Sequence, residues 1–96
     1  MITEIDAADY LTLSAAWKLD QGLPSNREIA SAKLFSTEML SKVTDTCIQV
    51  HGGMGLMEEL PIQRLWRDSR LERIWDGTSE IQRHIITRSI LRPLGA

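Results

Sequence analysis

Cysteine is scarce in this sequence, since Cys47 is the only one in 96 residues. A lone cysteine forms no internal disulfide and excludes a metal site built from several cysteines. No apolar run approaches the roughly 20 residues that cross a membrane, so no membrane span is predicted. Residues 1–6 carry neither a basic patch nor an apolar stretch, so we expect no secretory signal there. A reducing, cytoplasmic setting is the expected location.

An excess of charge of one sign is also missing. The formal net charge is −2, which gives no general attraction to nucleic acid. The apolar fraction of 43% and the charged fraction of 25% are those of an average soluble domain rather than a disordered tail. Because a domain this short buries a limited fraction of its surface, we expect it to have partners.

Apolar residues recur at helical spacing in two long segments, and no alternation of period two is present. The first predicted helix covers 5–20 and ends before Gly22 and Pro24, the usual order of stop signals. The apolar positions of this helix are Ile5, Ala8, Leu11, Ala15 and Leu19.

A second predicted helix begins at Ser25, where Ser25 and Glu28 have the spacing of a capping box. At more than 20 residues, about 35 Å by the rise per residue, it is expected to be the longest element. Cys47 falls on its apolar side and is expected to be buried packing. The apolar positions of this helix are Ile29, Ala32, Phe35, Met39, Val43, Thr46 and Val50.

Two shorter helices are predicted after the glycines that follow His51. The segment 61–70 has proline in its first turn, where proline is tolerated. The last helix begins near 76–79, where Ser79 and Gln82 have capping-box spacing. Its expected buried residues are Ile81, Ile85 and Ile86. The chain is therefore predicted to be all-α, with three or four amphipathic helices.

Four arginines recur at every third residue, and acidic residues stand between them. A basic stripe can indicate nucleic acid, but the interleaved acids favour pairing with carboxylates inside the domain or across a subunit interface. The histidines His51 and His84 are isolated, so no metal site is predicted. The three tryptophans are interpreted as packing anchors. The arginines are Arg64, Arg67, Arg70 and Arg73.

Several motifs carry a resemblance to a known family. The segment 49–55 reads QVHGGMG and matches Q-x-x-G-G-x-G. RDSR at 67–70 and IWDGTSEIQR at 74–83 match R-D-A-R and I-Y-E-G-T-x-x-I-Q-R. PIQR at 61–64 matches P-V-E-R, and AKLF at 32–35 matches A-K-x-F. These motifs follow one another along the chain in the order and with the spacing of the family. The chain therefore resembles the C-terminal helical domain of the acyl-CoA dehydrogenases over nearly its whole length.

The resemblance implies one domain, 1–96, with the fold of a partial up-down four-helix-type bundle that lacks the bundle's first helices. It implies FAD as cofactor and the α,β-dehydrogenation of an acyl-CoA thioester, a step of fatty acid metabolism. The electrons would pass to an electron-transfer flavoprotein. Family members assemble through this domain, so a homo-oligomer, dimer or tetramer, is expected, or a complex with the missing portion of the flavoprotein.

The resemblance also implies roles for single residues. Asp76 stands where the family has its catalytic base, usually a Glu that is longer by one methylene. Such a base removes the α-proton of the substrate, and a carboxylate in a water-excluded site is a stronger base than in water. Gly77 would lie against the substrate. The residues at cofactor-binding positions are Gln49, Val50, His51, Gly52, Gly53, Thr78, Ser79 and Glu80.

Each of these roles has a plainer structural alternative. Asp76 would serve well as the N-cap of the last helix. The alternative for the segment 49–53 is a glycine-terminated helix end with a solvated glutamine, and the alternative for 78–80 is an ordinary first helical turn. For the whole chain, one alternative is a non-catalytic oligomerisation or assembly module, and another is a helical interaction domain without flavin. The isolated chain is expected to be inactive, because a base without flavin has no hydride acceptor.

Overall fold

The computed structural model describes residues 1–95, which form four α-helices and two short 3-10 helices and contain no strand. This confirms the all-α prediction. The longest helix has 26 residues and runs from one residue after Ser25 to His51, as predicted. In chain order the elements are α1 (Ile2–Asp20), α2 (Asn26–His51), η1 (Gly52–Leu56), α3 (Ile62–Glu72), α4 (Ser79–Leu91) and η2 (Arg92–Leu94).

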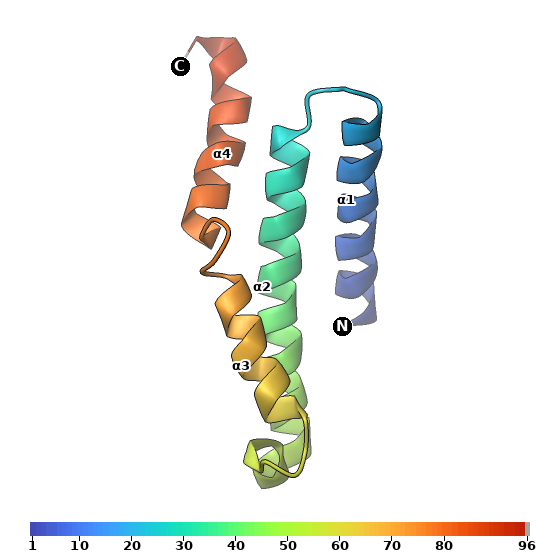
Figure 1. The fold of residues 1–96 in the computed structure, drawn as a ribbon, viewed down its shortest axis with the longest axis vertical. Helices are drawn as coiled ribbons and strands as arrows, with labels where there is room; N and C mark the ends of the chain where they lie inside the picture. The colour runs from blue at the N-terminus through green and yellow to red at the C-terminus, as the bar shows by residue number, and fades with distance from the viewer. Residues whose placement is uncertain (96) are drawn as a thin grey trace.

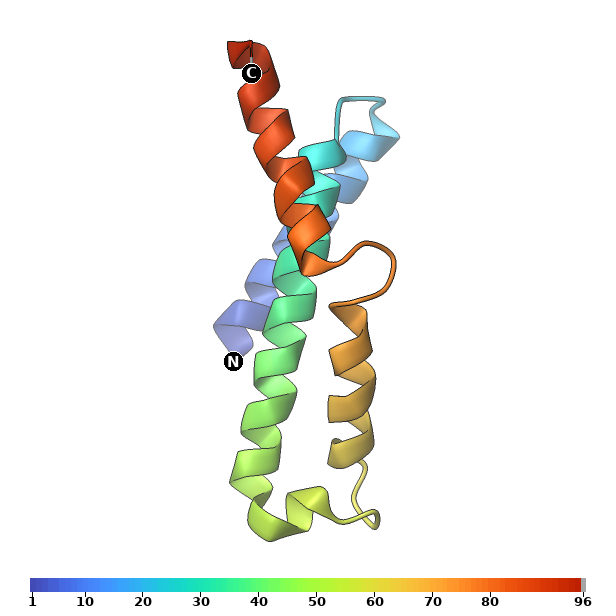
Figure 2. The same ribbon diagram turned by 90° about the vertical axis from the view of Figure 1, so that its left-hand side faces the viewer.

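Helix α2 is the axis of the molecule. Within the described part of the chain it contacts the other three α-helices, and those three make no close contact with one another. Helix α1 runs antiparallel to α2 along one side, while α3 and α4 follow each other along another side (Figure 1). Seen from the side, α3 returns from the lower end of α2 and α4 continues to the C-terminus (Figure 2). The arrangement is an open up-down-up bundle.

The core of this bundle is small. Its buried apolar side chains are four alanines and one isoleucine, because the helices approach one another through small residues. The radius of gyration is 16.1 Å, against about 12.5 Å for a compact domain of this length. The accessible surface is 7003 Å², against about 5,600 Å² for a compact monomer of this mass. The buried apolar residues are Ala8, Ala15, Ala30, Ala32 and Ile62.

Large apolar side chains consequently remain on the surface, which corrects several predicted burials. Ile81 is half exposed, at 50%, although Ile85 and Ile86 beside it are partly buried as expected. All three tryptophans are exposed rather than anchoring the core. Cys47 is only half-buried. Each outer helix has one helical neighbour, and a single neighbour covers only part of an apolar stripe.

The starts of α2 and α4 differ from the predicted capping boxes. Ser25 is the N-cap of α2, but its hydroxyl makes no capping hydrogen bond. Glu28 instead accepts a 2.7 Å hydrogen bond from Lys18 Nζ on α1, and this bond lowers the pKa of Glu28. At α4 the N-cap is Thr78, one residue before the predicted Ser79. In both cases the side chain predicted to cap its own helix forms a hydrogen bond with another helix instead: Glu28 with Lys18, and Ser79 with Glu38.

No helix among residues 1–95 combines the length and the apolar character that a membrane crossing requires.

Candidate functional site

The loop between α3 and α4, residues 73–78, contains the predicted base. Asp76 has a φ of 52°, and it is the one non-glycine residue with positive φ in the part of the chain described. Gly77 follows with a φ of 92°. Positive φ is uncommon for a residue with a side chain, and it persists where the surroundings hold it, often at functional sites. Two side chains of α2 hold this loop in place.

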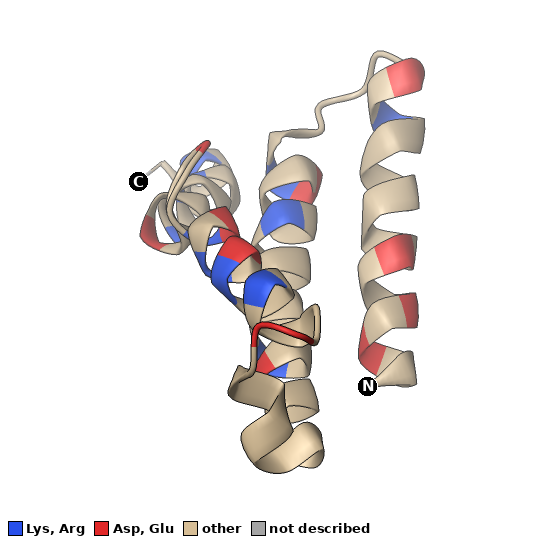
Figure 3. Ribbon diagram, turned by 60° about the horizontal axis from the view of Figure 1, so that its bottom comes forward, with Lys and Arg blue, Asp and Glu red and all other residues tan. Residues whose placement is uncertain are grey.

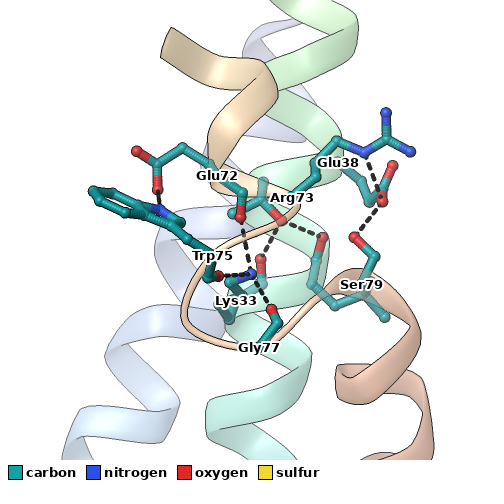
Figure 4. Close-up of polar contacts among 9 residues, drawn as sticks. Lys33, Glu38, Glu72, Arg73, Trp75, Gly77 and Ser79 are labelled. Carbon is teal, nitrogen blue, oxygen red and sulfur yellow. Dashed lines mark hydrogen bonds and ion pairs between the residues drawn. The ribbon is translucent and has the colours of Figure 1, made fainter.

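The ammonium group of Lys33 on α2 is the first tie (Figure 4). Its Nζ donates to the carbonyl oxygen of Glu72 at 2.8 Å, of Trp75 at 3.1 Å and of Gly77 at 2.6 Å. A lysine has three donors, so all three are used. Because Glu72 ends α3, the positive charge also stands where the helix dipole favours it. One side chain of α2 thus fixes the loop before and after Asp76.

The carboxylate of Glu38, also on α2, is the second tie. Its Oε1 accepts hydrogen bonds from Ser79 Oγ at 2.6 Å and from Arg73 Nε at 3.0 Å (Figure 4). These bonds, led by that of Ser79, lower the pKa of Glu38. The backbone N–H of Ser79 also donates to the carbonyl oxygen of Arg73 at 3.1 Å, which closes the loop at its base.

Asp76 itself lies at the exposed tip of this loop. Among residues 1–95 its carboxylate has no hydrogen-bond or ion-pair partner, while its carbonyl oxygen accepts from Gln82 Nε2 at 3.4 Å. The alternative role as the N-cap of α4 is wrong, because Thr78 Oγ1 accepts from the backbone N–H of Ile81 at 3.2 Å and fills that role. The carboxylate is thus free for a ligand.

A glycine at position 77 is favoured by its neighbour and by its backbone conformation. A Cβ atom at this position would collide with the side-chain amide of Gln82, which is itself buried. The positive φ adds a second reason, because it disfavours any residue with a side chain. The glycine therefore lets the buried amide approach the backbone next to Asp76.

The end of α2 and the glycine corner after it contain one of the two groups of predicted cofactor residues, 49–53. The three glycines of this corner differ from one another. Gly52 ends α2 with a φ of 66°, and its N–H donates to the carbonyl oxygen of Gln49. Gly55 is buried, and a Cβ there would lie 2.8 Å from the carbonyl oxygen of Ile48. Gly53 has neither constraint, because its φ is not positive and a Cβ there would meet no atom within 4 Å. Nothing inside the described chain requires glycine at this position.

The side chains before that corner point to solvent. Gln49 and Val50 are exposed, the latter at 79%. His51 is exposed as well, and its Nδ1 lies 2.7 Å from the carbonyl oxygen of Cys47, to which it donates when Nδ1 carries a hydrogen. The glutamine and the open glycine therefore form an accessible polar corner.

Within one chain, the structure does not bring the two groups of predicted cofactor residues together. Helix α3, with 11 residues and a length of about 16 Å, separates the glycine corner from the start of α4. In the part of the chain described, η1 contacts α2 and α3 but not α4. At α4, Glu80 is exposed, whereas Ser79 is 3% exposed with its hydroxyl engaged by Glu38. Cofactor binding by these residues stays a prediction.

One of the four arginines at every third residue forms an ion pair. Arg73 pairs with Glu38, as expected for pairing inside the domain. Arg64, Arg67 and Arg70 are exposed and form no ion pair with any other described residue. Acidic residues stand among the basic ones along α3 (Figure 3). No group of three or more histidine, cysteine, aspartate or glutamate side chains within 1–95 is placed to hold a metal ion.

Sequence reasoning missed Lys33 and Glu38. Lys33 was part of the AKLF match but carried no role, and nothing marked Glu38. Their partners lie between 35 and 44 residues away along the chain, so no local spacing signals these contacts. Only the packing of α3 and α4 against α2 brings them together.

Known proteins resemble this chain over nearly its whole length. The family model described as "Acyl-CoA dehydrogenase, C-terminal domain" matches residues 1–91. The chain belongs to the acyl-CoA dehydrogenase family. It is 46% identical over 92 residues to the probable acyl-CoA dehydrogenase YngJ of Bacillus subtilis, and the match covers 96% of this chain and 24% of that protein.

Solved structures of similar proteins have the same fold. Butyryl-CoA dehydrogenase from Megasphaera elsdenii matches with a TM-score of 0.92 and 35% identity, over 96% of this chain and 24% of that chain. The FAD complex of PigA matches with a TM-score of 0.88 and 32% identity, over 99% and 24%. The chain therefore spans about a quarter of the length of these relatives.

Proposed function

We propose that this chain is the C-terminal helical domain of a flavin-dependent acyl-CoA dehydrogenase, with Asp76 as its base. The observation that carries the proposal is the unpartnered carboxylate of Asp76 at positive φ, in a loop tied to α2 by Lys33 and Glu38. A positioned base requires a free carboxylate that is held in place, and uncommon backbone conformations cluster at such sites.

In this proposal the chain contributes the proton-transfer half of the reaction. Asp76 accepts the α-proton of the acyl-CoA thioester on a carboxylate oxygen, and the β-hydrogen leaves with its electron pair. Gly77, without a side chain, lets the thioester approach the backbone. When bound, FAD supplies the acceptor for that hydride. Because Asp76 is exposed on this chain, the substrate and the rest of the protein have to exclude water from it.

The residues at the glycine corner fit contact with FAD. Gly52 and Gly53 leave open space where side chains would stand, and Gln49 is exposed beside them. Backbone amides at such a corner suit a pyrophosphate or ribose group. Thr78 and Glu80 would provide the second contact, at the start of α4.

Separation of these two groups by α3 supports an assembly in which more than this one chain surrounds the cofactor. We expect a homo-oligomer, dimer or tetramer, or a complex with the remaining portion of the flavoprotein. The exposed apolar side chains and the excess accessible surface favour contact with another chain, which would bury them. Light scattering at high concentration is expected to show self-association, and a stable monomer would contradict it. We also expect that the electrons pass to an electron-transfer flavoprotein and that the protein is located in the cytoplasm.

The first test is an absorption spectrum of this chain purified from its native host with whatever co-purifies. A flavin band near 450 nm, roughly the usual position, is expected, together with acyl-CoA dehydrogenation by the assembled flavoprotein. The isolated chain is expected to be inactive, and turnover by it alone would contradict the proposal.

Substitution of Asp76 in that flavoprotein tests the base directly. Asp76→Asn is expected to lower kcat by about 1,000-fold or more, because the amide accepts no proton at neutral pH. Asp45→Asn, which removes an exposed carboxylate of α2, is the matched control and is expected to leave the rate unchanged. A rate that survives Asp76→Asn would favour the non-catalytic assembly module, which the Asp in place of the family's usual Glu also suggests.

A further inference from the structure

We propose that Lys33 is a positioning residue that sets the direction from which the carboxylate of Asp76 reaches its substrate. The inference rests on the proposed role of Asp76 as base, and it adds a residue that lies outside the loop. Lys33 is partly buried on α2, and its Nζ is the point at which three carbonyl groups of the loop converge (Figure 4).

The geometry connects this ammonium group to the backbone of Asp76. The peptide plane before Asp76 carries the carbonyl oxygen of Trp75, which Lys33 Nζ holds at 3.1 Å. The peptide plane after it carries the carbonyl oxygen of Asp76, which Gln82 Nε2 holds at 3.4 Å. Rotation about the Asp76 backbone bonds moves one plane against the other. Lys33 and Gln82 together therefore restrain the positive φ of Asp76.

The next peptide plane is held by the same lysine. The carbonyl oxygen of Gly77 lies 2.6 Å from Lys33 Nζ, the shortest of its three contacts, and accepts a second, longer bond of 3.4 Å from Gln82 Nε2. Without the ammonium, the carbonyl oxygens of Glu72, Trp75 and Gly77 would turn their negative ends toward one another. Removal of Lys33 therefore leaves the part-buried carbonyl of Glu72 and the exposed carbonyl of Trp75 without this donor, and leaves the carbonyl of Gly77 with only the long bond from Gln82.

Position matters here because an aspartate has little reach of its own. One side-chain carbon separates its carboxylate from Cα, so the backbone direction largely decides where the oxygens lie. A displacement of 1 Å at a reacting group costs about 100-fold in rate. Loss of the restraint on φ is therefore expected to reduce catalysis, while the substrate contacts made outside this loop stay in place.

The test uses the flavoprotein that contains this chain. Lys33→Met keeps an unbranched side chain that is one atom shorter and removes the ammonium. It is expected to lower kcat by about 10- to 100-fold, with KM within about 3-fold. Lys42→Met, an exposed lysine on the same helix, is the matched control and is expected to change neither. Thermal unfolding and the flavin band verify that each variant is folded, and Lys33→Gln replaces Lys33→Met if that variant does not fold.

A double-mutant cycle with Asp76→Asn separates positioning from general structural damage. If Lys33 acts through Asp76, Lys33→Met lowers the rate no further in the Asp76→Asn background. An equal loss in both backgrounds would overturn the inference and leave the base intact. No loss from Lys33→Met alone, with a large loss from Asp76→Asn, would do the same. A rate unaffected by Asp76→Asn would overturn the base, and the positioning role with it.

Hydrogen exchange of the chain gives a readout independent of turnover. The amides of 74–79 are expected to exchange faster in Lys33→Met than in the parent or in Lys42→Met, because the loop loses three hydrogen bonds. Unchanged exchange of this loop would show that Lys33 does not hold it, and would overturn the inference.

Discussion

The hydroxyl group of Ser79 donates a 2.6 Å hydrogen bond to the carboxylate of Glu38, 41 residues earlier in the chain. The same carboxylate oxygen accepts from Arg73 Nε at 3.0 Å. Ser79 is the first residue of α4 and Arg73 follows the last residue of α3, so Glu38 joins both helices to α2. The buried apolar residues of this bundle are mostly alanines, so these polar contacts join helices that share little buried apolar surface.

Removal of the Glu38 contacts is expected to destabilise the fold. Glu38→Gln keeps the shape and loses the charge, and we expect a decrease in the free energy of unfolding of about 1 kcal/mol. The estimate is modest because the side chains of Arg73 and Glu38 are 34% and 29% exposed. Urea unfolding measures the change. Glu58→Gln, an exposed glutamate without a partner in the described chain, is the control, and equal effects of the two would contradict the prediction.

The same carboxylate predicts how stability depends on pH. The pKa of Glu38 lies below its ordinary value of 4.5, chiefly because of the hydrogen bond from Ser79 and then that from Arg73. A lowered folded-state pKa contributes stability that is fully present above the unfolded pKa and is lost as the pH falls through the folded one. Thermal unfolding between pH 7 and about 3 is expected to show this loss, starting near the ordinary value. Glu38→Gln is expected to show a shallower loss, and an unchanged profile would count against the contact.

The glycine corner predicts opposite outcomes for two neighbouring glycines. Gly55→Ala places a Cβ 2.8 Å from the carbonyl oxygen of Ile48 and is expected to destabilise the chain by about 1–3 kcal/mol. Gly53→Ala meets open space and is expected to be neutral or slightly stabilising. In the flavoprotein, Gly53→Ala is expected to weaken FAD binding, measured by titration of the apoprotein. A folded Gly53→Ala variant with unchanged affinity would remove Gly53 from the cofactor contact.

The start of α4 predicts the effect of losing its cap. Thr78 Oγ1 accepts from the backbone N–H of Ile81, so Thr78→Ala is expected to lower the free energy of unfolding by about 1 kcal/mol. Thr87 on the same helix donates to the carbonyl oxygen of Arg83 and caps nothing. Thr87→Ala is therefore expected to be near neutral, because alanine is the better helix former. Thermal unfolding of both variants measures the difference, and a neutral Thr78→Ala would contradict the cap.

Comparison of the predicted and observed helices shows why the helices were easy to predict and their surroundings were not. Periodicity placed α2 and the other helices because backbone hydrogen bonding and side-chain spacing are local. The capping boxes at Ser25 and Ser79 were wrong because Glu28 and Ser79 turn to partners on other helices. Exposure of Ile81 was missed because a stripe indicates which side is apolar, not whether a neighbour covers it.

The sequence by itself determined that the chain is helical, where its glycine corners fall and which family its motifs resemble. It also indicated Asp76 as the candidate base, since that assignment depends on an ordered string of neighbouring residues. Only the tertiary structure decided that Asp76 is not a helix cap, that Gly53 and Gly55 serve different purposes, and that Lys33 and Glu38 hold the loop. The contacts of Lys33 and Glu38 join residues 35 to 44 positions apart, which no local pattern encodes. The cap and the glycine contacts are local, but they depend on the path that the backbone takes through each corner.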